Sequence, residues 1–329
     1  MNQSTHPIVQ LLIERQRTGS KPNKRSDSRK VALAIEGGGM RGVVSAGMVA
    51  GLEQLALTDA FDAVYGASAG AVIGAYFVAK QARYGATIFY EDINNRHFID
   101  IGRLFKFEPI LSLEFLLDFV CVKKKILAVD RILNSTIPLF VVASSLARRE
   151  SAALSNFVDA PDLFEALRCS ARIPFIAGPP VRYRDELFVD ACVYESIPFR
   201  AAEAAGYTDI VALLTRPFGD RRSRPGWIDR LLVAPHLRRF NVSAAAAYMN
   251  RDKSYADDLE VLYSRADGSS YPCLLLIQKP AHLTKVLPFN TSREALVAGA
   301  KAGFQAVYSA FGLDLPDLVE ILTPAGLVT

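Results

Sequence analysis

A serine flanked by glycines is the residue of this chain whose setting points most directly to chemistry. Ser68 is the centre of Gly66-Ala67-Ser68-Ala69-Gly70, which follows the apolar run 61–65 and precedes the apolar run 71–79. This order predicts a strand, a sharp turn and a helix, a geometry that projects a serine hydroxyl beside a helix N-terminus. Glycines suit such a turn because side chains there would collide with the adjacent strand and helix. The pattern indicates a nucleophile, although a serine that only caps the helix fits the same residues.

A second glycine-rich turn precedes this serine in the chain. Gly37-Gly38-Gly39-Met40-Arg41-Gly42 stands between the apolar run 31–36 and the segment 43–56, which has helical spacing. As a dinucleotide-binding turn it would need an acidic residue at the end of the second strand, but Asp62 begins that strand. Consecutive backbone N–H groups at a helix N-terminus also suit a developing oxyanion. We expect this second use; a turn that serves only close packing is the alternative.

The group that would activate the serine is less evident. A Ser–Asp–His order built from Ser68, Asp190 and either His236 or His282 matches the α/β-hydrolases. That fold places several strands before its serine, whereas here only one strand precedes the serine's own. The other candidate is Asp190 acting directly on the serine hydroxyl. It ends the short apolar run 187–189, where a buried carboxylate needs a partner; a helix or turn cap is the alternative role.

Three further features, taken in order with the serine turn, resemble the patatin-like phospholipases. They are the glycine run with Arg41, the segment 166–174, and Val189-Asp190 followed by Ile197-Pro198. The resemblance runs from about Val31 to Pro217 and leaves residues 84–160 and the C-terminal third uncovered. It implies an α/β/α sandwich and a serine–aspartate dyad that uses no histidine.

The resemblance also implies roles for individual residues. Ser68 would be the nucleophile and Asp190 its general base. The family hydrolyses acyl esters of phospholipids and other lipids, usually without a metal, so we expect an acyl-ester lipid substrate, no metal and no cofactor. The expected oxyanion-hole residues are Gly38, Gly39, Met40 and Arg41. The remaining motif glycines are Gly37, Gly42, Gly66 and Gly70.

One departure from the family's pattern follows the aspartate. The family usually has glycine and then glycine or alanine there, whereas this chain has Ala191 and Cys192. If the first position required a positive φ, alanine would add strain of about 1 kcal/mol. This departure favours an alternative in which the domain is catalytically silent and binds a lipid or a protein.

Length and composition indicate one α/β domain. The chain has 329 residues, of which 50% are hydrophobic, and a net charge of +4, which is too small to indicate a nucleic-acid partner. The β-α-β-α opening predicts a mainly parallel sheet between layers of helices, a three-layer sandwich. We expect a single domain over 31–329, with helical insertions and a helical C-terminal region. Residues 1–30 are polar and predicted to be a mostly disordered arm with a short helix around Val9–Gln16.

The sequence also bears on the protein's surroundings. The four cysteines are scattered and the N-terminus carries no secretory signal, which favours reduced thiols and a cytoplasmic location. Export by a signal-independent route would leave no mark in the sequence. The apolar run Ile110–Val122 with the lysines after it, and the basic stretch Arg216–Arg239 with Trp227, predict a face for peripheral membrane contact. The alternative is that the first is core and the second a solvated surface.

Overall fold

A mainly parallel sheet forms the centre of the molecule. The computed structural model describes residues 6–106, 108–283 and 285–315. The sheet has eight strands in the order β5-β6-β3-β2-β1-β7-β8, with β4 paired to β3. The strands are β1 (Val31–Ile35), β2 (Ala63–Ala67), β3 (Leu139–Ser145), β4 (Glu150–Leu154), β5 (Val181–Tyr183), β6 (Glu186–Val189), β7 (Asp209–Leu214) and β8 (Cys273–Gln278).

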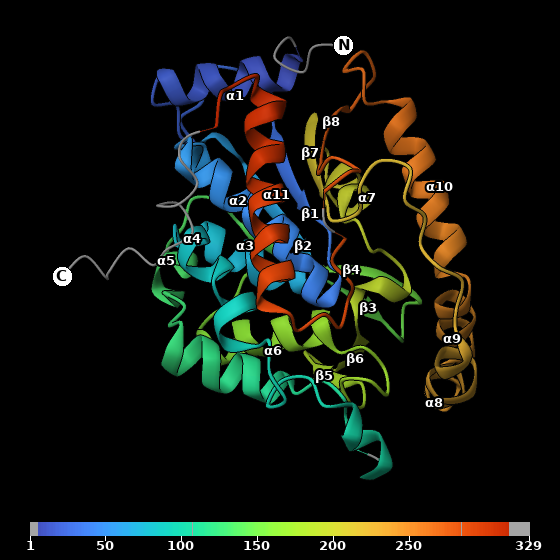
Figure 1. The fold of residues 1–329 in the computed structure, drawn as a ribbon. Coiled ribbons are helices and arrows are strands. Elements are labelled where there is room, and N and C mark those ends of the chain that lie inside the picture. Colours follow the sequence, from blue (N-terminus) through green and yellow to red (C-terminus); the bar gives the residue numbers. More distant parts are fainter. Residues whose placement is uncertain (1–5, 107, 284, 316–329) are drawn as a thin grey trace, which may run out of the picture.

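Helices cover both faces of this sheet (Figure 1). One apolar core joins the sheet to α2, α3 and α11, and a second joins its other face to α7 and α10. The expected three-layer α/β sandwich is therefore the observed fold. The helices are α1 (Pro7–Arg17), α2 (Val43–Gln54), α3 (Ala69–Val78), α4 (Ala82–Ala86), α5 (Val129–Leu133), α6 (Ala160–Ala171), α7 (Phe199–Ala204), α8 (Ala234–Arg238), α9 (Val242–Met249), α10 (Arg251–Ser264) and α11 (Arg293–Phe311).

Strand register brings two distant parts of the chain to one place. β2 runs parallel to β3 with Ala67 opposite Val142, and β6 runs antiparallel to β3 with Val189 opposite Ser144. One residue further along each strand, Ser68 and Asp190 both reach the level of Ala143. Because β4 occupies one edge of β3 over residues 141–145, β2 and β6 share the other edge, and their next residues meet end to end there.

The pair α2 and α11 is the closest helix contact of the fold. A Cβ built on Gly47 would lie 1.9 Å from the carbonyl oxygen of Ala300, and one built on Gly303 would lie 1.9 Å from that of Val44. The backbones of the two helices therefore touch at these glycines. This contact holds α11 against the helix that follows the glycine-rich turn.

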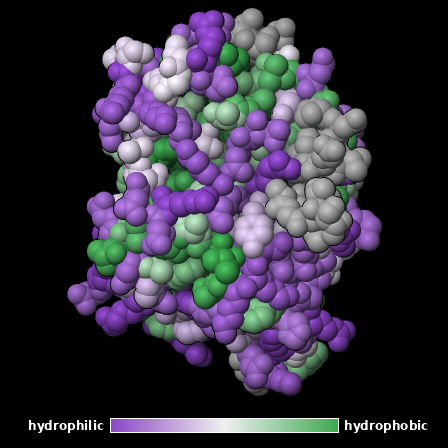
Figure 2. All heavy atoms as spheres, turned by 90° about the vertical axis from the view of Figure 1, so that its left-hand side faces the viewer, coloured by the Kyte–Doolittle hydropathy of each residue, from purple (hydrophilic) through white to green (hydrophobic). Residues whose placement is uncertain are grey.

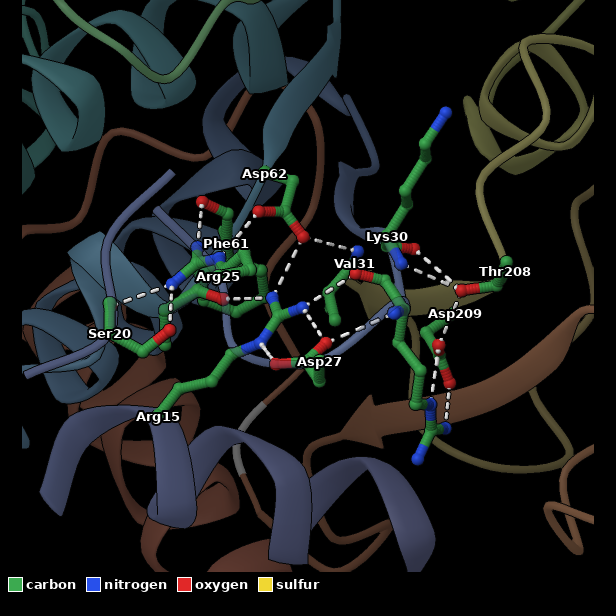
Figure 3. Close-up of polar contacts among 12 residues, drawn as sticks. Arg15, Ser20, Arg25, Asp27, Lys30, Val31, Phe61, Asp62, Thr208 and Asp209 are labelled. Atoms are coloured by element: carbon green, nitrogen blue, oxygen red, sulfur yellow. Dashed lines mark hydrogen bonds and ion pairs between the residues drawn. The ribbon is translucent and has the colours of Figure 1, made fainter. Parts of the chain in front are cut away.

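The N-terminal segment differs from the sequence expectation. The short helix expected within residues 1–30 is present as α1. The rest was expected to be mostly disordered, but the described part of this segment packs on the domain. The buried guanidinium of Arg15 donates to Asp27 and Asp62, at 2.7 Å each. Opposite charges that are far apart in the chain meet here, and composition alone does not reveal such pairing. Figure 3 also shows Arg25 bound to Asp62. Arg29 forms a further ion pair with Asp209.

The middle of the chain is built from short irregular helices. They include a 3-10 helix at Ile101–Lys106 and two π-helices at Ile88–Asp92 and Phe115–Lys124. The run Ile110–Val122, expected at a membrane face, is mostly buried, and only Phe119 and Val122 among its large apolar residues are exposed. That expectation is wrong for most of the run, because its side chains belong to the main core.

The outer surface is mixed in character. From the side of α4 and α5, hydrophilic residues cover most of the molecule and hydrophobic ones form small groups (Figure 2). None of the helices in the described ranges combines the length and the apolar character that crossing a bilayer requires.

Candidate active site

The strand-turn-helix predicted around Ser68 is present between β2 and α3. Ser68 is buried and adopts φ 54°, a left-handed conformation that is uncommon for a residue with a side chain. Its two flanking glycines are needed for close approach. A Cβ on Gly66 would lie 2.5 Å from the Cα of Ala71, and one on Gly70 would lie 2.3 Å from the carbonyl oxygen of Ile35. The turn thus aims the hydroxyl away from the sheet's own hydrogen bonds.

The hydroxyl of Ser68 donates directly to Asp190. The distance from Oγ to Oδ2 is 2.7 Å, and the other carboxylate oxygen accepts the backbone N–H of Cys192 at 2.8 Å. Asp190 is buried. Burial raises the pKa of Asp190, while the hydrogen bonds from Cys192 and Ser68 and the charge of Arg222 act in the opposite direction. One oxygen of the Asp190 carboxylate is therefore placed to accept the proton of the Ser68 hydroxyl, while the other oxygen is bound to the backbone of Cys192.

The residues after Asp190 do not carry the strain that the sequence suggested. Ala191 begins a short 3-10 helix, Ala191–Val193, and is not among the residues with positive φ. Alanine is therefore compatible with this turn. The residues after Asp190 no longer favour a catalytically silent domain. Burial raises the pKa of the Cys192 thiol to about 12, so this cysteine stays protonated near neutral pH.

Ser170 contributes to the site in a way that sequence analysis missed. It lies in α6 and is fully buried. Its hydroxyl accepts the backbone N–H of Ser68 at 2.8 Å and donates to the carbonyl oxygen of Val142 at 2.5 Å. Ser170 thus ties the serine turn to β3. The segment containing it was noticed as a motif, but a contact across the fold cannot be read from a local pattern.

The glycine-rich turn contacts the serine turn, but not all of the backbone N–H groups that were expected to be free are free. A Cβ on Gly37 would lie 2.8 Å from the Cβ of Ser68, so the two turns are in contact. The N–H of Met40 donates to the carbonyl oxygen of Pro288 at 3.0 Å, and that of Arg41 donates to Gly38 at 3.2 Å. The expectation that Met40 offers a free amide is therefore not met, and the amide of its neighbour Arg41 is also occupied.

The amides of Gly38 and Gly39 remain as donors. Neither makes a backbone hydrogen bond to another residue of the described ranges. Gly38 has φ +150°, which a residue with a side chain rarely adopts, and Gly39 has φ +59°. Both glycines thus adopt backbone conformations that favour glycine over a residue with a side chain.

A buried polar cluster holds the glycine-rich turn in place. Arg41 donates from Nε to the hydroxyl of Thr215 at 2.9 Å, and its guanidinium lies 3.8 Å from Glu36. Glu36 also accepts the hydroxyl of Tyr255 at 3.0 Å. Burial lowers the pKa of Arg41, partly offset by the charge of Glu36. The side chain of Arg41 therefore supports the loop from behind.

Two cavities of opposite character meet at Ser68. The larger, of about 320 Å³, also contains Asp190 and the glycine-rich turn, and its lining is rich in arginine and lysine. The narrower, of about 50 Å³, is lined mostly by apolar side chains, among them Val72 and Tyr76 of α3 and Phe89. Ser68, Gly39, Leu111 and Ile173 belong to both linings.

The histidines of the alternative triad lie away from this junction. His236 packs against Phe175 and Phe240, and His282 is exposed. Neither lines either of the two cavities that contain Ser68. In the described ranges no group of three or more His, Cys, Asp or Glu residues could hold a metal ion.

These features define an α/β protein with a serine at a strained strand-to-helix turn and a carboxylate against its hydroxyl. The family model for patatin-like phospholipases matches residues 33–203. The chain belongs to the patatin-like phospholipase family.

Relatives add little beyond the family itself. The chain is 25% identical over 206 residues to the uncharacterized protein YjjU of Escherichia coli K12, an alignment covering 61% of this chain and 56% of that protein. The chain thus spans just over half of that relative's length. The crystal structure of VipD from Legionella pneumophila aligns with 86% of this chain and 67% of that one, at 14% identity and a TM-score of 0.40.

Proposed function

We propose that this protein is a lipid acyl hydrolase that uses Ser68 as nucleophile and Asp190 as general base. The observation that carries the proposal is the 2.7 Å contact between Ser68 Oγ and Asp190 Oδ2, made without an intervening imidazole. Asp190 takes the hydroxyl proton as Oγ attacks the ester carbonyl carbon. Membership of the patatin-like phospholipase family supports a lipid ester as the substrate.

The amides of Gly38 and Gly39 would stabilise the negative charge that this attack creates. Both glycines line the cavity that contains Ser68, and their amides have no backbone acceptor within the described residues. Losing one such donor typically costs about 3 kcal/mol of transition-state stabilisation. The backbone supplies this stabilisation, so no side chain of the loop has to reach the oxyanion.

The tetrahedral intermediate then collapses to an acyl-enzyme. The C–O bond to the leaving alcohol breaks, and protonated Asp190 returns its proton to that alcohol. Water attacks the acyl carbon next, with Asp190 accepting its proton. The bond between the acyl carbon and Oγ then breaks, Asp190 returns the proton to Oγ, and the acid leaves a free Ser68. The apolar cavity at Ser68 suits the acyl chain during both steps.

Hydrolysis of a chromogenic short-chain ester tests the dyad. Ser68→Ala and Asp190→Asn should each lower kcat by at least about a hundredfold, the scale of general-base catalysis. Asp258→Asn is the matched control, because Asp258 of α10 is also a buried aspartate but pairs with Arg200 of α7. Wild-type rates in either dyad variant would remove that residue from the mechanism.

A further inference from the structure

The larger cavity carries more positive charge than its carboxylates neutralise. Seven arginine and lysine side chains and four carboxylates line it. Two of these carboxylates are occupied: Asp220 pairs with Arg216 at 3.3 Å and with Lys285 at 3.2 Å, and Asp229 pairs with Arg251 at 2.9 Å. The other two are Glu36, which belongs to the polar cluster behind the glycine-rich turn, and Asp190, which contacts Ser68.

Three cations of the lining have no carboxylate within ion-pair distance among the residues that the structure describes. Arg224 is exposed. Arg222 is half-buried and donates to the hydroxyl of Ser196 at 2.7 Å. Lys279 is 2% exposed, and its ammonium donates to the carbonyl oxygen of Leu283 at 2.9 Å. The charge of Asp220 acts on Lys279, but Asp220 already pairs with Arg216 and Lys285. A buried ammonium without a carboxylate of its own is costly, so its retention in a cavity calls for an anionic ligand.

Two of these cations lie at the same edge of the sheet as Ser68 and Asp190. Arg222 lies in the loop after β7 and Lys279 directly after β8, two strands that run parallel to β1. In open parallel sheets, ligands bind outside the carboxyl ends of the strands. Arg222 is also close enough to Asp190 for its charge to oppose the rise in that group's pKa. The cations thus share one cavity with the dyad.

The two cavities can then be assigned to the two halves of an ester. The apolar cavity accepts the acyl chain, which leaves the basic cavity for the alcohol that departs. Guanidinium and ammonium groups together suit phosphate oxygens, since arginine offers paired planar donors and lysine a compact charge. Burial lowers the pKa of Lys279, and a bound anion would favour its charged form.

We propose that the leaving-group half of the substrate carries a phosphate monoester, which Arg222 and Lys279 bind. This proposal rests on the proposed function and specifies its substrate class: an acyl ester of a phosphorylated alcohol. The site should prefer it over a zwitterionic or an uncharged ester with the same acyl chain. Arg222 and Lys279 are then residues that determine specificity.

Three soluble esters with one medium-length acyl chain test this preference. They are the acyl glycerol phosphate, the acyl glycerophosphocholine and the monoacylglycerol, each used below its micelle-forming concentration so that surface charge plays no part. The expected kcat/KM for the phosphate monoester exceeds that for the uncharged ester by about tenfold or more, the scale of charge-assisted hydrogen bonds. Arg222→Gln and Lys279→Gln should each bring this ratio toward one.

Arg221→Gln is the matched control. Arg221 is adjacent to Arg222 but exposed and outside the cavity, so its removal changes net charge equally and should leave the ratio unchanged. Equal turnover of all three esters, or equal loss of preference in Arg221→Gln and Arg222→Gln, would overturn the phosphate proposal while leaving Ser68-dependent hydrolysis intact. Hydrolysis that persists in Ser68→Ala would instead contradict the proposed function.

Binding of glycerol 3-phosphate tests the cavity without any turnover. Titration calorimetry on the Ser68→Ala protein should detect this product of the phosphate ester, and Arg222→Gln and Lys279→Gln, each added to Ser68→Ala, should weaken the binding by about tenfold. Glycerol is the uncharged comparison ligand and should not bind measurably. If glycerol 3-phosphate binds no better than glycerol, or equally well in all the variants, the phosphate proposal is wrong.

Discussion

At the scale of single residues, the environment of Asp190 decides what the site can do. The carboxylate must be ionised to take a proton from Ser68. It is buried, and burial raises its pKa, while Arg222 works against that rise. Through the charge of Arg222, the pKa of Asp190 therefore depends on a cation of the larger cavity.

The pH dependence of the reaction should report this link. A general base loses activity as pH falls through its pKa in the free enzyme, and here the pKa is raised. The acid limb of kcat/KM should therefore lie above the ordinary aspartate value of 3.8. Arg222→Gln removes a positive charge that favours the ionised form, so its limb should move to higher pH.

The same profile for Arg221→Gln is the control, because that side chain lies outside the cavity. Its acid limb should coincide with that of the unchanged protein. The uncharged monoacylglycerol ester is the substrate of choice, since its own ionisation cannot contribute. A limb that stays in place in Arg222→Gln would mean that Arg222 does not act on Asp190.

Local patterns predicted some of these residues and not others. Ser68 and Gly38 stand in short motifs whose backbone demands are visible in the sequence, and Asp190 ends an apolar run. Ser170, Arg222 and Lys279 act through contacts that only the fold creates. The amide of Met40 was expected to be free, but it donates to the carbonyl oxygen of Pro288, which comes from a part of the chain far away in the sequence.

At the scale of elements, the register of β2, β3 and β6 positions the dyad. Ser68 and Asp190 meet beside Ala143 because β2 and the antiparallel β6 approach the same edge of β3 from opposite directions. The sequence indicated the parallel β-α-β-α opening, since its apolar periods and glycine turns are local. It could not indicate the reversed strand, because a run as short as 187–189 carries no mark of its direction.

The glycine contact between α2 and α11 should be sensitive to a single methyl group. Gly303→Ala places a Cβ 1.9 Å from the carbonyl oxygen of Val44, so the helices must separate. We expect the free energy of unfolding to fall by about 1–3 kcal/mol, the usual cost of overpacking, despite the gain in helix propensity. Urea unfolding followed by circular dichroism measures this.

Ser309→Ala in the same helix provides the comparison. Ser309 is exposed, so alanine there changes helix propensity without adding a contact. Its unfolding free energy should stay within about 0.5 kcal/mol of the unchanged protein. If Gly303→Ala proved as stable as Ser309→Ala, the two helices would not be in backbone contact at that point.

At the scale of the whole molecule, exposed apolar and basic side chains gather around η8 (Asp229–Val233) and α8. Trp227 is 65% exposed and Leu231 67%, and Arg230, Arg238 and Arg239 are exposed nearby in the chain. Figure 1 shows α8 and α9 together at one end of the molecule, remote from α1. We propose that this region contacts the surface of an anionic membrane.

Sedimentation with lipid vesicles tests this surface. Trp227→Ser should weaken binding to vesicles that contain anionic lipid by roughly tenfold, because the membrane would lose the apolar contact of a large side chain. Val158→Ser removes another exposed apolar side chain from a different part of the chain and should leave binding unchanged. Equal binding of Trp227→Ser and the unchanged protein would rule this surface out as the membrane contact.

The central claim is that a buried carboxylate directly activates the hydroxyl of Ser68. Intact-mass spectrometry after reaction with a fluorophosphonate measures this most directly, since the reagent needs an activated serine but no particular lipid. The account predicts a single adduct, mapped by peptide analysis to Ser68, formed far more slowly in Asp190→Asn and absent in Ser68→Ala. An adduct that forms equally fast in Asp190→Asn, or no adduct on the unchanged protein, would contradict it.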